Sequence, residues 1–241
     1  MRFEDPVFLG IDTSTRWRSV GISAGNGHEE SLNWNATRAE ERDLLPKIEE
    51  LLASEKIRLQ DLSGIAVTIG PGSFTALRVG VSVAQGLGMG LEIPVVPVGS
   101  LEPFPHSVGE NLDRATVLLP ARSGEVFVQT YSRQEGRPWT PENVVECLTI
   151  EDAIGSYKNP GIWIGPGLFH YDETIAAVGG NGASRGGEST RVSRAGVVAR
   201  LGRDRWKNCP DGFPPESVAI NYHQSHGALT IAQRKGDKNH V

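Results

Sequence analysis

Short apolar runs separated by turn residues dominate the beginning of the chain. The runs "VFLGIDTS", "RSVGIS" and "EESLNW" have strand-like patterns, and "AGNG" at 24–27 is a tight-turn signal between the last two. Leucine and isoleucine then recur at helical spacing along "RAEERDLLPKIEELL". Thr37 and Glu40 are spaced as a capping box at the start of this helix, and Pro46 is expected to kink it. The pattern predicts three strands followed by a helix.

A strand and a second helix complete the first half. Residues 65–69 form a strand-like run that ends in a Gly-Pro-Gly turn, and a long apolar helix is expected over about 73–90. The strand-like "PVVPVG" and a short helix follow. The predicted order is therefore strand-strand-strand-helix-strand-helix.

The second half repeats this order. We expect strands at "ATVLLPA", "EVFVQTYS" and "ENVVECL", a short helix at "TIEDAIGSY", a strand and turn at "GIWIGPG", and a helix at "LFHYDETIA". The tetrapeptide Ile-Gly-Pro-Gly at 69–72 recurs at 164–167, in the matching place of each half, which indicates an internal duplication. The predicted fold class is α/β, with two lobes that each pair a mixed sheet with helices.

The lobes are expected to meet near Leu112. We assign 1–111 to the N-terminal lobe, 112–232 to the C-terminal lobe and 233–241 to a disordered tail. After residue 178 the chain becomes glycine-rich and polar, and "SRAGVVARLGRDRWKN" then predicts a helix that returns to pack.

Composition restricts the function classes. A formal net charge of −5 over 241 residues argues against a protein that binds nucleic acid by itself, because phosphate binding draws on clustered Lys and Arg. Two cysteines are too few for a disulfide framework. The N-terminus lacks the apolar core of a signal peptide, and no apolar run approaches the ~18 residues of a membrane span. We expect a cytoplasmic protein.

Two lobes of this plan are typical of the actin, Hsp70 and sugar-kinase group, whose first hairpin wraps nucleotide phosphates with an Asp-x-Gly-Thr/Ser loop. Here the corresponding residues 12–17 contain no glycine, although close backbone approach to a phosphate usually needs one. Asp12, Thr13 and Ser14 are therefore candidates for a residual nucleotide contact only. The competing interpretation of Asp12 is a turn residue that satisfies neighbouring N–H groups. In the second hairpin, Pro120 stands where phosphotransferases of this plan place an acid.

Other catalytic arrangements are missing from the sequence. His223 and His226 are the one close pair of histidines, without Cys or carboxylate support for a metal. There is no G-x-S-x-G elbow, and the turn at 70–72 is followed by no lysine before Lys158, so it is not a Walker loop. We expect no metal site, no cofactor and no catalytic residue.

The helix after the Gly-Pro-Gly turn has one mixed stripe. At 100° per residue, its apolar residues form two sides, and Gly80 and Gly88 are expected to face inward. The remaining side holds Phe74, Arg78, Ser82, Gln85 and Met89, flanked by Gly86 and Gly90. This side either packs within the molecule or serves as a protein–protein surface, since Phe, Arg and Met are typical interface anchors. On the second interpretation, Leu44, Leu45 and Ile48 of the first helix join it.

The segments "GIDTS", "LLPKIEELL", "IGPGSFTALRVGVSVAQGLG", "PVVPV" and "ARSGEVFVQTY" carry a family resemblance. In this order, from about residue 7 to 170, the chain resembles the TsaB/YeaZ family, the dimerisation subunits of the bacterial machinery that makes tRNA threonylcarbamoyladenosine. Ala76 and Pro120 depart from the family pattern, and the usual Pro-x-Tyr-Leu-Arg near the end is not recognisable around Glu216 to Tyr222.

The resemblance implies a two-lobed actin/Hsp70-like fold and a non-catalytic scaffold. It implies pairing with the catalytic paralogue TsaD, cooperation with the small ATPase TsaE, a homodimer without the partner, and contact with tRNA only through the complex. The complex would modify adenosine 37 of tRNAs that read ANN codons. Two alternatives stay open, an ATP-dependent phosphotransferase of the same fold and a glycopeptidase-like protein.

Overall fold

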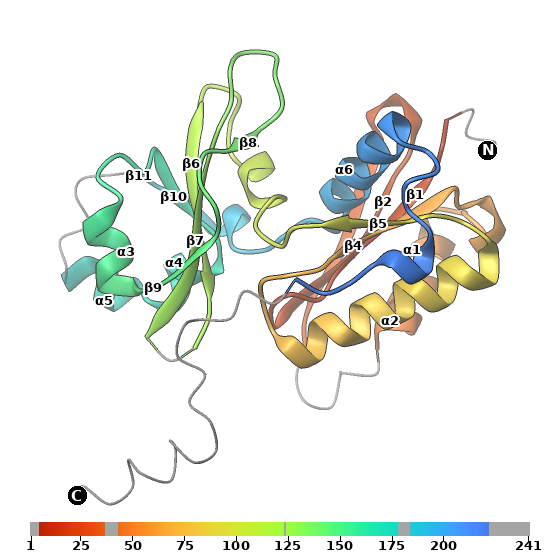
Figure 1. Cartoon of the computed structure of the whole chain (residues 1–241), viewed down its shortest axis with the longest axis horizontal. Helices are drawn as coiled ribbons and strands as arrows, with labels where there is room; N and C mark the ends of the chain where they lie inside the picture. Colours follow the sequence, from red (N-terminus) through yellow and green to blue (C-terminus); the bar gives the residue numbers. More distant parts are fainter. Residues whose placement is uncertain (1–4, 37–42, 123, 178–183, 222–241) are drawn as a thin grey trace, which may run out of the picture.

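The computed structural model describes residues 5–36, 43–122, 124–177 and 184–221 and forms two lobes side by side (Figure 1). The first lobe holds a five-stranded sheet in the order β3-β2-β1-β4-β5. Strands β1, β2 and β3 are antiparallel neighbours, whereas β4 and β5 run parallel to β1. The strands are β1 (Phe8–Asp12), β2 (Trp17–Ser23), β3 (Glu29–Asn35), β4 (Gly64–Thr68) and β5 (Val95–Val98).

The second lobe repeats the topology of the first. Its sheet has the order β11-β10-β6-β7-β8, and β9 also pairs with β7, so β9-β7-β6-β10-β11 matches β3-β2-β1-β4-β5. Parallel and antiparallel pairs match as well. The duplication predicted from the repeated tetrapeptide is therefore present in the strand order. The strands are β6 (Arg114–Pro120), β7 (Glu125–Ser132), β8 (Thr140–Pro141), β9 (Glu146–Thr149), β10 (Ile162–Ile164) and β11 (Ser184–Arg185).

Helices cover both faces of the first sheet. Figure 1 shows α2 and α6 on opposite sides of it, and side chains of α1 share the core of α2. The second sheet carries three shorter helices. The helices are α1 (Leu44–Ser54), α2 (Phe74–Leu91), α3 (Ile150–Ser156), α4 (Pro166–His170), α5 (Asp172–Ala177) and α6 (Ala195–Asn208). Among the described residues, no helix is long and apolar enough to span a membrane.

The alternation of side chains along β1 explains why the first sheet lies between helices on both faces. Leu9 and Ile11 of β1 belong to the core beneath α1 and α2, because successive side chains of a strand point to opposite faces. Phe8 points the other way and packs against Trp206 of α6, with 5.6 Å between ring centroids. The first sheet is thus buried on both faces.

Helix α6 returns from the end of the chain to the first lobe. Gly10 permits the close approach, because a Cβ at this position would lie 1.9 Å from the Ala195 carbonyl oxygen. Two serine hydroxyls accept hydrogen bonds from the first amides of α6, Ser19 Oγ from Ala195 N at 3.0 Å and Ser31 Oγ from Gly196 N at 2.9 Å. The range 112–232 is therefore not one lobe, since its last helix packs on the other.

Two local expectations change, and a third lies outside the described residues. Helix α1 begins at Leu44, so Pro46 lies in its first turn, where a missing N–H costs no helical hydrogen bond and no kink is required. The capping box of Thr37 and Glu40 lies outside the described residues. The single helix expected at "LFHYDETIA" is two short ones, α4 and α5, which meet at Tyr171.

Candidate functional site

The Gly-Pro-Gly turn attaches the start of α2 to the first hairpin. Gly70 and Gly72 have φ of +126° and +153°, values that side-chain-bearing residues rarely adopt. A Cβ on Gly72 would lie 2.4 Å from the Ser14 carbonyl oxygen, and Ser73 N donates to the same oxygen at 2.8 Å. The turn therefore requires glycine for close backbone packing, and α2 starts at a fixed place beside the β1–β2 turn.

The inner face of α2 is the predicted core stripe. Leu77, Val81 and Ala84 are at most 5% exposed. Gly80 faces the Thr13 side chain, and Gly88 faces the Val95 side chain of β5. The inward positions of both glycines are confirmed.

The outer face of α2 is open and partly apolar. Phe74 and Met89 are 50% and 53% exposed, and Arg78 and Ser82 are exposed between them. The Arg78 guanidinium stacks on Phe74, 3.9 Å from the ring centroid. A Cβ on Gly86 would meet nothing within 4 Å. This face can therefore receive another surface closely without any change in the monomer.

Helix α1, whose buried side chains share the core of α2, also exposes one apolar side chain. Leu45 is 49% exposed. Among the described residues, four large hydrophobic side chains are at least 49% exposed, and three of the four belong to α1 and α2. They are Leu45, Phe74, Met89 and, in the second lobe, Val144.

Three residues predicted for this surface make contacts within the molecule. Leu44 and Ile48 are 2% and 1% exposed, so both belong to the core of their own lobe. The Gln85 side-chain amide donates to the carbonyl oxygens of Pro215 and Val218, each at 3.1 Å, and holds the C-terminal segment against α2. No sequence pattern indicated these backbone partners of Gln85.

Two of the predicted nucleotide residues, Asp12 and Thr13, hydrogen-bond within the fold through their side chains. Asp12 is 1% exposed, and its Oδ1 accepts from Ser14 N and from Thr68 Oγ1, both at 2.9 Å. Thr13 Oγ1 donates to the carbonyl oxygen of Ala76 at 2.7 Å. The turn interpretation therefore accounts for the Oδ1 oxygen of Asp12, whereas its buried Oδ2 has no partner among the described residues. Of the three predicted nucleotide residues, Ser14 borders open space.

That open space is a cleft of about 840 Å³ between the lobes. The two duplicated hairpin turns border it from opposite lobes, and the start of α2 and helix α4 complete it. The sequence indicates both turns, but it does not assign their arginine and aromatic side chains to a common site. The cleft-lining side chains that the sequence did not identify as site residues include Arg16, Trp17, Arg122, Phe169 and Arg191.

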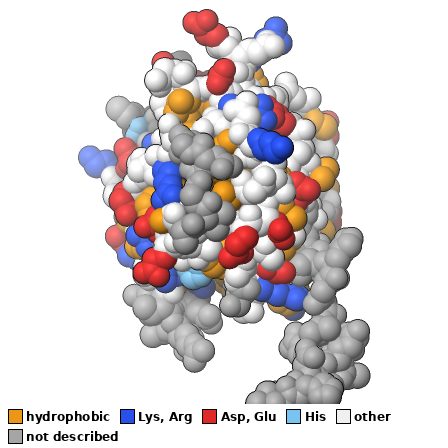
Figure 2. All heavy atoms as spheres, turned by 90° about the vertical axis from the view of Figure 1, so that its left-hand side faces the viewer, with side chains coloured by type: hydrophobic (Ala, Val, Ile, Leu, Met, Phe, Trp, Pro, Cys, Tyr) orange, Lys and Arg blue, Asp and Glu red, His pale blue; other side chains and the backbone are white. Residues whose placement is uncertain are grey.

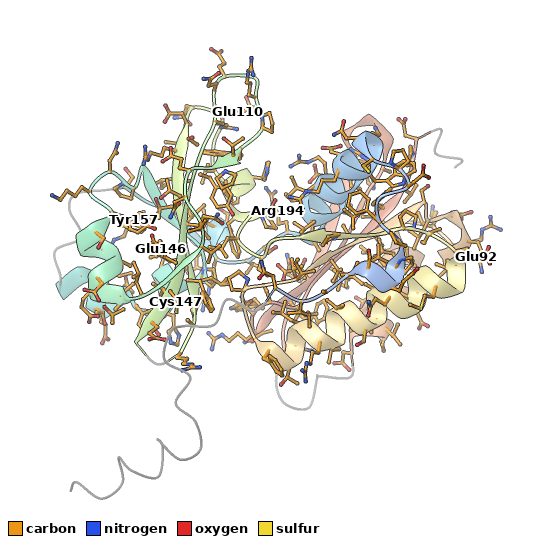
Figure 3. The ribbon with its side chains drawn as sticks, viewed as in Figure 1. Glu92, Glu110, Glu146, Cys147, Tyr157 and Arg194 are labelled. Carbon is orange, nitrogen blue, oxygen red and sulfur yellow. The ribbon has the colours of Figure 1, made fainter. Side chains whose placement is uncertain are left out.

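The cleft offers no obvious catalytic group. Burial, together with the nearby Glu125 carboxylate, raises the pKa of the Cys147 thiol, which keeps it protonated and a poor nucleophile. Figure 3 labels Cys147 on the side of the second lobe that faces the first. Among the described residues, no three His, Cys, Asp or Glu side chains lie together in a set that could hold a metal ion.

Comparison with known proteins gives a consistent result. The family model of tRNA N6-adenosine threonylcarbamoyltransferase (TsaD) matches residues 34–146. The tRNA threonylcarbamoyladenosine biosynthesis protein TsaB of Haemophilus influenzae is 30% identical over 177 residues, which cover 69% of this chain and 75% of that protein. TsaB of Escherichia coli is 32% identical over 148 residues, covering 59% and 62%.

Solved structures agree in fold. YeaZ from Pseudomonas aeruginosa superposes with a TM-score of 0.72 at 24% identity, over 90% of this chain and 99% of that one. This likeness shows the shared two-lobed architecture. Together with the extent of the sequence matches, it leads to one conclusion: the chain belongs to the TsaB family.

Proposed function

We propose that this chain is a non-catalytic scaffold subunit of the complex that transfers a threonylcarbamoyl group to adenosine 37 of tRNA. Its relatives are named for the biosynthesis of this modified nucleoside. The observation that carries the proposal is the exposed outer face of α2, which combines apolar anchors with a glycine that leaves room for a second helix.

The proposed docking surface consists of the exposed residues of α1 and α2. Large side chains that are half exposed in the monomer gain most from burial, at ~25 cal/mol per Å² of apolar area, and Arg on an aromatic ring is a frequent interface pair. The surface comprises Leu45, Phe74, Arg78, Ser82, Gly86 and Met89.

The partner is the catalytic paralogue. The TsaD family model matches residues 34–146, a range that contains both α1 and α2, so the paralogue shares this part of the fold. Two related chains can then pack equivalent helix pairs around an approximate twofold axis. In the absence of the paralogue, a second copy of this chain would occupy the same surface, and the two assemblies would compete.

The rest of the molecule supports a scaffold role. The Asp12 carboxylate is buried and accepts two hydrogen bonds within the fold through Oδ1, and Pro120 can neither bind a metal nor accept a proton. Net charge is −5, and Figure 2 shows acidic and basic side chains interspersed over the visible face of the second lobe. We therefore propose that tRNA and the small ATPase meet this chain within the cytoplasmic complex.

Reconstitution tests the proposal. Threonylcarbamoyl transfer to tRNA is measured with the paralogue and the small ATPase, with and without this chain. We expect transfer to depend on this chain, ATP turnover by the chain alone to equal a buffer control, and tRNA binding by the chain alone to be weak. Transfer that proceeds equally well without the chain would contradict the scaffold role. Magnesium-dependent turnover by the chain that is lost in Asp12→Ala would favour the phosphotransferase instead.

A further inference from the structure

The cleft between the lobes has the size and boundaries of a small-molecule site. Its volume of about 840 Å³ falls within the range of ligand pockets, roughly 300–1,000 Å³. The β1–β2 turn contributes residues 14–17, and its duplicate, the β6–β7 turn, contributes residues 120–122 from the other lobe. Nothing in the scaffold role uses this space, because the outer face of α2 is a different surface.

Positive charge gathers in the cleft although the chain as a whole is acidic. Arg16, Arg122 and Arg191 line it, against a single carboxylate, Glu125. Arg16 and Arg122 are exposed at the two facing turns, one from each lobe. Several positive charges that line a concave site raise the electrostatic potential there and attract anions.

Hydrogen-bond donors also point to an anion. The 18-residue helix α2 starts at the cleft, its N-cap Ser73 makes no side-chain capping bond, and its first turn contains no acid. Its first amides and the positive end of its dipole therefore favour a negative group. Ser14 is 2% exposed and borders the cleft, and its hydroxyl has no partner among the described residues. The Trp17 indole N–H likewise has none there.

The aromatic residues that line the cleft indicate the shape of the uncharged part of the ligand. Trp17 from the first lobe and Phe169 from the second both lie near Arg191, whose guanidinium carbon is 5.3 Å and 5.4 Å from their ring centroids. Phe74 and Phe127 add two more rings to the lining. Such walls suit a flat, apolar ring system better than a sugar or an aliphatic chain.

We propose that this cleft binds a planar aromatic anion with a single carboxylate or phosphate group, held by Arg16, Arg122 and the start of α2 without a metal ion. One carboxylate lines the cleft, and Asp12 is turned into the fold. A magnesium-bound triphosphate therefore lacks its metal ligands here, whereas a single anionic group needs only donors and cations. The site is independent of the scaffold proposal except at Phe74, which borders both surfaces.

Calorimetric titration of the full chain tests this with two probes, indole-3-acetate and the uncharged indole-3-acetamide. We expect the acetate to bind and the acetamide to bind at least about tenfold more weakly, because it lacks the charge-assisted contacts. The double variant Arg16→Gln/Arg122→Gln should lose this preference. The matched control Arg137→Gln removes an exposed arginine that does not line the cleft and should leave it unchanged.

Three results would overturn the proposal: no binding of indole-3-acetate, equal binding of the two probes, or a preference that survives in the double variant. Trp17→Phe provides a second check, because it keeps an aromatic wall and removes one donor, and should weaken the acetate more than the acetamide. ATP that binds only with magnesium, and displaces the acetate, would contradict the metal-free character of the site. Thermal melts of each variant confirm that the fold is retained.

Discussion

The two lobes use the same tetrapeptide to leave a strand, but they build different surfaces after it. Residues 69–72 lead into α2, which has 18 residues, whereas residues 164–167 lead into α4, which has five. Both turns pack glycine on backbone, with Gly72 against the Ser14 carbonyl and Gly167 against the Leu118 carbonyl. The shared turn thus determines the connection, and the helix that follows decides whether a lobe presents an extended outer face.

In the second lobe, a hydrogen-bonded tyrosine lies where helix α4 ends. The Tyr171 hydroxyl, between α4 and α5, accepts a hydrogen bond from Gly124 N and donates to the Arg122 carbonyl, each at 3.1 Å. This residue ties the helix break to the β6–β7 turn. The first lobe has an uninterrupted helix in the matching place, and α6 covers the opposite face of its sheet.

The largest expected effect comes from separating the first lobe from α6. Gly10→Val should lower the free energy of unfolding by about 3 kcal/mol or more, because its side chain would collide with the backbone of Ala195. Chemical denaturation measures the change. Gly187→Ala is the control, since a Cβ there meets nothing within 4 Å, and should shift stability by less than about 0.5 kcal/mol. Equal stability of Gly10→Val and wild type would mean that α6 is not seated on this sheet.

The next effect concerns the two hairpin turns, where equivalent substitutions should change the stability by different amounts. Asp12→Ala should cost about 1–3 kcal/mol, because Ser14 N and Thr68 Oγ1 lose their buried acceptor. Pro120→Ala, at the matching turn, should cost under about 1 kcal/mol. Thermal melts and phosphate-release assays measure both properties, and ATP turnover should equal background in both variants. A neutral Asp12→Ala would show that the carboxylate is not structural.

A pH-dependent effect is expected at the junction between the lobes, near which Figure 3 labels Arg194. Burial, followed by the charges of Arg200, Arg133 and Arg194, lowers the pKa of His106 to about 4. The unfolded histidine takes up a proton below about pH 6.5, whereas the folded one stays neutral down to about 4. The free energy of unfolding should therefore fall as pH drops from 6.5 towards 4, by roughly 2–3 kcal/mol.

His106→Gln should flatten this pH dependence, because glutamine does not titrate. The measurement is a denaturation series between pH 7 and pH 5, with His28→Gln as the control for a half-exposed histidine paired with Glu55. An unchanged slope in His106→Gln would assign the pH dependence to another group.

Sequence patterns predicted the topology well, because period-two and period-3.6 patterns report directly which faces are buried. They also indicated the solvent-facing stripe of α2. They failed where a partner is distant in sequence. Leu44 and Ile48 looked like surface candidates because helical spacing alone does not tell which side of a short helix meets the sheet. The Gln85 contacts with Pro215 and Val218 cross more than a hundred residues.

The composition of the cleft could not be predicted from the sequence either. The Asp12–Trp17 and Pro120–Gly124 turns were recognised separately, but neither pattern shows that Arg16 and Arg122 lie on the same cleft from opposite lobes. Likewise, the return of α6 to the first sheet depends on Gly10, a glycine that a strand pattern treats only as a weak position.

The most direct test of the scaffold account is a comparison of two helical glycines. Gly86 of α2 and Gly155 of α3 are both exposed, and a Cβ on either meets nothing within 4 Å. Leucine at either position should leave the monomer folded, as a thermal melt verifies. Binding to the catalytic paralogue, measured by light scattering and titration, should weaken by about 1–3 kcal/mol or more for Gly86→Leu and stay unchanged for Gly155→Leu. Undiminished binding by Gly86→Leu would place the interface elsewhere and contradict the central claim.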